Sequence, residues 1–105
     1  MSDTEAKIPK LYRMIESKHP QVAGLHRQLA DAARAEGPID TKTAHLIQLA
    51  AATAIRSEGA VHSHARRALE AGASKEEIRH AVILLTTTLG FPAIAAAMDW
   101  LNDLI

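Results

Sequence analysis

The chain has 105 residues, enough for one hydrophobic core, and its 12 basic and 12 acidic residues cancel, so no basic face indicates nucleic-acid binding. It contains no cysteine, which excludes disulfides, thiolate catalysis and thiolate metal ligands within this chain. The N-terminus is polar, unlike a secretory signal, and the longest apolar run, residues 81–85, is too short to span a membrane. We therefore expect a cytoplasmic protein with no membrane and no nucleic-acid partner.

The first half of the sequence predicts three helices. Apolar residues recur at helical spacing in residues 9–17, 21–35 and 41–56. His19-Pro20 separates the first two segments, because the residue before a proline is disfavoured in helical geometry. Gly37-Pro38 ends the second segment.

The second half predicts three more helices. Gly59 is expected to break the preceding helical pattern, and Gly72 suits the left-handed position after the helix that follows. Ser74 and Glu77 form a capping box for a fifth helix that Gly90 stops, and a sixth runs from residue 92 to about residue 104. The predicted fold is an all-α, single-domain bundle of about six helices.

The fifth predicted helix is apolar on most of its circumference. Ile83 and Leu84 lie off the stripe formed by Ile78, Val82 and Leu85, and such a helix is buried on more than one side. Self-association into a homo-oligomer would cover the second side. The alternative is a helix that is central within its own monomer.

His64 is the residue whose position most needs an explanation. It lies in the apolar stripe of the fourth helix, with Val61, Ala65 and Ala68. A core histidine would place its ring nitrogens on buried hydrogen-bond partners. The functional alternative is a histidine that lines a pocket and carries a proton.

Several runs of residues resemble the carboxymuconolactone decarboxylase and alkylhydroperoxidase D-like family. These runs are Asp40-Thr41-Lys42-Thr43, Leu46-Ile47 and Leu49-Ala50, then His64-Ala65 and residues 68–78, then Gly90 and Pro92-Ala93. The resemblance covers roughly Val22 to the C-terminus. It implies an all-α domain over residues 21–105 that assembles into trimers or hexamers, with residues 1–20 as an N-terminal extension carrying a short helix.

The resemblance also implies candidate site residues. The redox branch of the family uses a Cys-x-x-Cys pair, and Ser57 and Ala60 occupy those positions here, while His45 stands in place of a glutamate of the proton relay. Without a thiol, no disulfide cycle with peroxide is possible in this chain. The decarboxylase branch needs a general acid and a cation for a carboxylate; His64 fits the first role, with His45 as a second proton carrier, and Arg56 fits the cation.

Spacing disfavours a metal site. His62 and His64 project about 200° apart on one helix and cannot hold one ion. If the third and fourth helices turn near Glu58, His45 and His64 lie roughly 20 Å and 8 Å from the turn, about 12 Å apart along the axis. We therefore expect no metal and no cofactor. Three functions remain open: a non-redox acid–base enzyme of decarboxylase or lyase type acting on a small carboxylated molecule, a non-catalytic ligand- or metal-binding oligomer, and a degenerate relative of the peroxidases that serves as a scaffold.

Overall fold

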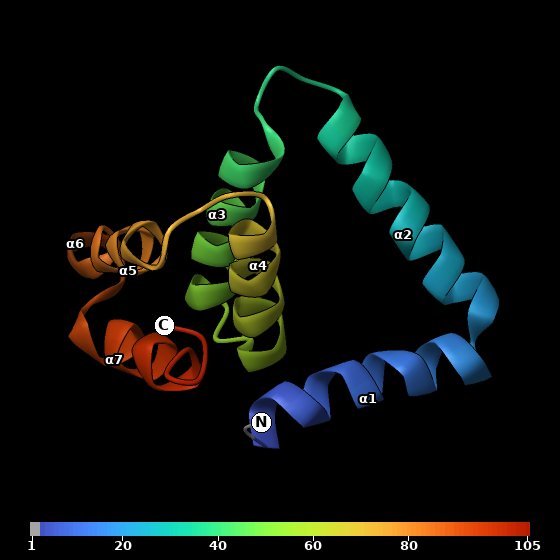
Figure 1. Ribbon diagram of the computed structural model, residues 1–105, viewed down its shortest axis with the longest axis horizontal. Helices are drawn as coiled ribbons and strands as arrows, with labels where there is room; N and C mark the ends of the chain where they lie inside the picture. Colours follow the sequence, from blue (N-terminus) through green and yellow to red (C-terminus); the bar gives the residue numbers. More distant parts are fainter. Residues whose placement is uncertain (1–2) are drawn as a thin grey trace. The chain divides into compact units, whose positions relative to one another are not determined.

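The computed structural model describes residues 3–105, with side chains from Lys10 onward. Over these residues the chain forms helices without strands, as predicted (Figure 1). The helices are α1 (Asp3–Lys18), α2 (Pro20–Ala35), α3 (Thr41–Ala54), α4 (Glu58–Glu70), α5 (Lys75–Ile83), α6 (Thr86–Leu89) and α7 (Phe91–Trp100). None of the helices in this part of the chain is both long enough and apolar enough to cross a membrane.

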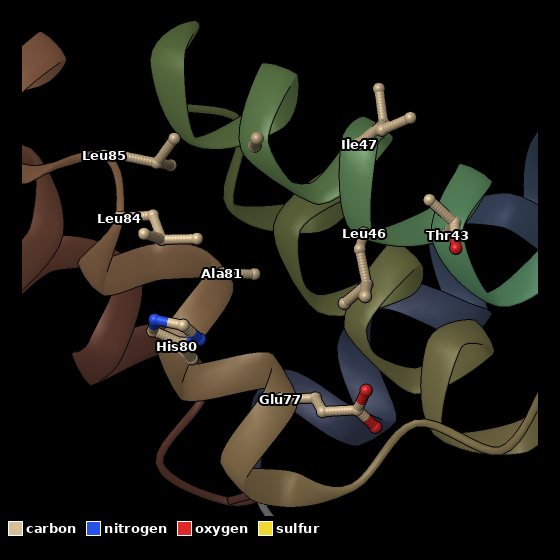
Figure 2. Close-up of a pocket in the computed structure, with 9 residues that line it drawn as sticks. Thr43, Leu46, Ile47, Glu77, His80, Ala81, Leu84 and Leu85 are labelled. Atoms are coloured by element: carbon tan, nitrogen blue, oxygen red, sulfur yellow. The ribbon is translucent and has the colours of Figure 1, made fainter.

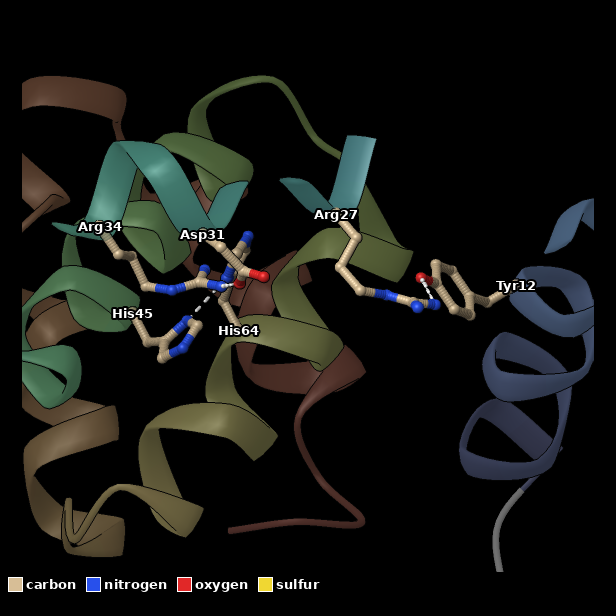
Figure 3. A network of polar contacts seen from close by, with 6 residues as sticks. All are labelled: Tyr12, Arg27, Asp31, Arg34, His45 and His64. Atoms are coloured by element: carbon tan, nitrogen blue, oxygen red, sulfur yellow. Dashed lines mark hydrogen bonds and ion pairs between the residues drawn. The ribbon is translucent and has the colours of Figure 1, made fainter. Parts of the chain in front are cut away.

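The chain divides into two compact units, one ending at Asp40 and the other comprising Thr41–Ile105. In the first unit, α1 packs against α2, and Arg27 of α2 donates a hydrogen bond to the Tyr12 hydroxyl of α1 (3.0 Å; Figure 3). Arg27 also pairs with Glu16 of α1. The hydrogen bond that Arg27 donates to Tyr12 and the pair with Glu16 raise the already high pKa of Arg27. The division of the chain at residue 20 stays a prediction.

The core of the second unit combines alanines with larger apolar side chains. Ala52 of α3 and Ala65 and Ala68 of α4 are buried, and these two helices pack against each other more extensively than any other pair among the described elements. Small residues allow two helix backbones to approach closely. The larger buried side chains are Leu49 of α3, Val61 of α4, Ile78 and Val82 of α5, Ile94 of α7, and Leu101.

The turn between α3 and α4 lies at residues 55–57, and the expected break at Gly59 is wrong. Arg56 adopts a left-handed conformation with φ of 56°, which ends α3. Ser57 is extended and its hydroxyl accepts a hydrogen bond from the Ala60 backbone N–H (3.4 Å), which caps α4. Because capping already starts the helix at Glu58, Gly59 lies within its first turn.

In contrast, two helix boundaries of the second unit were predicted correctly. Gly72 has φ of 106°, and the backbone N–H groups of Gly72 and Ala73 donate to the carbonyls of Leu69 and Ala68, the pattern of a Schellman motif. Ser74 and Glu77 form the predicted capping box at the start of α5.

The predicted fifth helix is shorter than expected, because it ends at Ile83 and α6 follows separately. The Thr86 hydroxyl donates to the carbonyl of Ile83 (2.7 Å). In a regular helix this carbonyl would accept the N–H of residue 87, so the threonine side chain competes with helix continuation.

Candidate functional site: a histidine pair between two helices

The structure brings His45 of α3 and His64 of α4 together (Figure 3). Their Nδ1 atoms are 3.2 Å apart and their ring centroids 5.4 Å apart, with the ring planes tilted by 34°. His45 is buried, with 4% of its surface exposed, whereas His64 is half-buried. The pair therefore joins an interior imidazole to one that is partly open at the surface.

The geometry is that of a hydrogen bond between two imidazole rings. The ring centroids are 5.4 Å apart, whereas the two Nδ1 atoms are 3.2 Å apart. The difference is close to twice the distance from the centre of an imidazole ring to one of its atoms, so the two Nδ1 atoms point at each other. A hydrogen bond between them requires one Nδ1 to carry hydrogen and the other to accept it. The two histidines must therefore adopt opposite tautomers, or share an additional proton as an imidazole–imidazolium pair.

The expectation that these histidines miss each other along the helix axis was wrong, and the position of the turn explains why. A turn centred on Arg56 instead of Glu58 places His45 eleven residues before it and His64 eight residues after it. At about 1.5 Å per residue, the axial offset falls to roughly 4–5 Å, which two imidazole side chains can span. Moving the turn by two residues shortens one arm of the hairpin by two residues and lengthens the other by two, so the axial offset between His45 and His64 changes by the rise of four residues.

The other histidine of α4 makes a separate contact. His62 is buried, and its Nε2 lies 2.9 Å from Oδ2 of Asp103, in the segment after α7. Its contact lies on a different element from that of His64, as the expected angle of about 200° between them requires. Sequence reasoning missed the role of Asp103, because one carboxylate after a helix has no spacing that relates it to a histidine 41 residues earlier.

The other predicted site residues lie at the closed end of the α3–α4 hairpin. Arg56 is exposed in the turn, and α3 rises about 13 Å between His45 and Ala54. Ser57 serves as the cap of α4, and Ala60 packs against the hydrophobic core. Arg56 and Ser57 lie at the far end of the hairpin from the histidine pair, whereas Ala60, four residues before His64, lies one turn from it on α4.

Metal ligands are not gathered in the part of the chain that the structure describes. Within it, no group of three or more histidine, cysteine, aspartate or glutamate side chains is arranged to hold an ion. The histidine pair supplies two nitrogens, and structural zinc sites use four ligands.

An apolar groove of about 350 Å³ lies between α3 and α5 (Figure 2). Leu46 and Ile47 of α3 line one wall, and Ala81 of α5 and Leu84, directly after α5, line the other. Glu77, at the groove, accepts hydrogen bonds from the Ser74 backbone and from Lys42 (3.0 Å), and these contacts hold the pKa of its carboxyl group below the ordinary value. The walls are mostly apolar, but His80 lines the groove together with Glu77, so the groove offers burial for an apolar group beside two ionisable side chains.

Comparison with known proteins identifies the family. The model of the carboxymuconolactone decarboxylase family matches residues 20–103, whereas no curated protein matches the sequence. A solved structure, that of apo-lpg0406, a carboxymuconolactone decarboxylase family protein from Legionella pneumophila, is similar in fold, with a TM-score of 0.79 and 23% identity over 95% of this chain and 92% of that chain. Because the family model matches most of this chain, the chain belongs to the carboxymuconolactone decarboxylase family.

Proposed function

We propose that this protein is a non-redox acid–base enzyme of the decarboxylase or lyase type, acting on a small carboxylated molecule. His64 is the proton carrier and His45 is its partner. The observation that supports this proposal is the 3.2 Å contact between the two Nδ1 atoms, which links the partly exposed ring to a buried one.

The proposed chemistry needs a proton and no electron acceptor. When a carboxylate leaves as carbon dioxide, the electron pair of the broken C–C bond remains on the substrate carbon, and an imidazolium delivers a proton to that carbon. The neutral His64 that results can recover a proton across the Nδ1–Nδ1 contact with His45, and because His45 is buried, the pair exchanges protons with solvent through the partly exposed His64 ring. Histidine suits this cycle because its pKa ordinarily lies near neutrality.

Thiol peroxidase chemistry does not fit this chain. The positions of the redox cysteines are occupied by Ser57 and Ala60, and the sequence contains no cysteine. A hydroxyl and a methyl group cannot cycle between thiol and disulfide states.

The proposal is tested by measuring carbon dioxide release from carboxymuconolactone and other small carboxylated lactones. His64→Gln should reduce turnover by about 10²–10⁴-fold, the usual contribution of a positioned acid or base, and His45→Gln should reduce it as well. His26→Gln, at an exposed histidine of α2, is the matched control and should retain activity. Turnover that survives in His64→Gln would contradict the proposal. Ligand binding without turnover would favour the non-catalytic alternative.

We also propose that the protein is a homo-oligomer, a trimer or hexamer as the family resemblance implies. The support is a set of large apolar side chains that are exposed in the single chain: Ile47 on α3, Ile83 and Leu84 at the end of α5, and Phe91 on α7. Sedimentation equilibrium at micromolar concentration should show no substantial 11.3 kDa species. Leu84→Glu should shift the distribution toward monomer, because it places a charge in the buried interface. A purely monomeric wild type would refute the assembly.

A further inference from the structure

Helix α4 is held by polar contacts that it makes with two different elements. His64 contacts His45 on α3, and His62 contacts Asp103 in the segment that follows α7. Residues two apart on a helix project about 200° from each other, so the two contacts hold opposite sides of the same turn. Together they restrain rotation of α4 about its axis.

The Asp103 carboxylate is held in place within the second unit by the contacts of the residues on both sides of it. Its side chain is 15% exposed and that of His62 only 2%. Leu101, two residues before it, is completely buried, and the carbonyl of Ile105, two residues after it, accepts a hydrogen bond from Arg79 of α5. The segment on both sides of Asp103 is thus attached to the core.

The apolar contacts of α4 are extensive but come mostly from small side chains. Its buried apolar residues are Val61, Ala65 and Ala68, and alanines present few ridges that could interlock with a neighbouring helix. A ring nitrogen lies about 6 Å from the helix axis, so a rotation of roughly 10° moves it by about 1 Å. Directed along the contact, that displacement would lengthen the 3.2 Å distance between the His64 and His45 nitrogens beyond hydrogen-bond distance.

We propose that His62 and Asp103 form a positioning pair that sets the rotation of α4 and so holds His64 Nδ1 against His45 Nδ1. Neither residue of this pair touches the substrate. The effect on catalysis rests on the proposed function, whereas the effect on the histidine contact does not.

The test reads the tautomers of the imidazoles directly. Long-range ¹H–¹⁵N spectra of ¹⁵N-labelled protein should show one of His45 and His64 as the Nδ1–H tautomer, because the Nδ1–Nδ1 hydrogen bond requires it. Asp103→Ala should remove this signature. Asp103→Asn, which keeps an oxygen acceptor for His62, should restore it. Asp99→Asn, at an exposed position of α7, is the control and should leave it unchanged.

The same variants separate positioning from mere stabilisation. A purely structural pair would lower the melting temperature of Asp103→Ala and leave the signature intact in the folded protein, which would overturn the proposal. If Asp103→Ala does not fold, His62→Gln provides the same comparison. With an active substrate in hand, Asp103→Ala should lower kcat by roughly tenfold or more at similar KM, since only the position of the proton carrier changes. If Asp103→Ala loses the Nδ1–H signature and the wild type turns over no tested substrate, the positioning role is retained and the proposed enzyme activity is rejected.

Discussion

Replacing Arg56 with glycine should stabilise the protein, although it removes a predicted substrate contact. Arg56 has φ of 56°, and a residue with a Cβ atom in this left-handed region is strained by about 1–2 kcal/mol. Glycine adopts the region without strain but loses about 0.5–1 kcal/mol more backbone entropy on folding. The difference predicts that Arg56→Gly raises the free energy of unfolding by roughly 0.5–1 kcal/mol.

Urea denaturation at neutral pH measures this change, with Arg67→Gly as the matched control. Arg67 lies within α4, where glycine costs about 1 kcal/mol, so the two arginine-to-glycine variants should shift stability in opposite directions. Equal destabilisation by both would refute the strain argument.

The same position tests the expectation that Arg56 binds a carboxylate. Arg56→Ala keeps a Cβ atom and therefore the strain, but it removes the guanidinium. Its stability should stay close to that of the wild type, and KM for a carboxylated substrate should rise if the side chain binds the carboxylate. Because Arg56 lies in the turn, about 13 Å along α3 from the level of His45, an unchanged KM would remove it from the site.

Three further predictions concern stability. The contacts with Ser74 and Lys42 lower the pKa of Glu77, so they stabilise the fold at pH values above its ordinary pKa of 4.5. This stabilisation is lost as the pH falls through the lowered pKa. The difference in urea midpoint between wild type and Glu77→Gln should therefore shrink from pH 7 to pH 3. Ile78→Ala, at a completely buried site, should cost about 2–5 kcal/mol in urea denaturation. His64→Gln should cost about 1–3 kcal/mol, since a buried nitrogen loses its imidazole partner, whereas the exposed His80→Gln should change the melting temperature little.

Local sequence signals predicted the helices well where they act over a few residues. Ser74 and Glu77 identify a capping box three residues apart, and Gly72 identifies a helix end, because each signal describes contacts within one turn. The signals were misleading where two of them compete. Gly59 indicated a helix break, but the left-handed Arg56 and the Ser57 cap had already formed one, and no propensity scale selects arginine for a left-handed position.

The two histidines of the candidate site were named from the sequence, whereas the contact between them was not predicted. His64 was identified by its place in the apolar stripe of the fourth predicted helix, and His45 by the family resemblance. The distance between them depends on where the hairpin turns, and an error of two residues there separates contact from a gap of several ångströms. The burial of His62 and its pairing with Asp103 depend on how the segment after α7 returns to α4, which is a tertiary property without a local pattern.

The presence of histidine at position 45, where the redox branch of the family carries glutamate, changes what a proton relay can do. A carboxylate at neutral pH only accepts hydrogen bonds, whereas an imidazole can accept at one nitrogen and donate at the other. A glutamate therefore suits the removal of a proton from a thiol. Two imidazoles in contact through Nδ1 can pass a proton in either direction, because each ring that gains a proton at one nitrogen can release one from the other. In a chain without cysteine, this exchange supports proton delivery to carbon better than thiol activation.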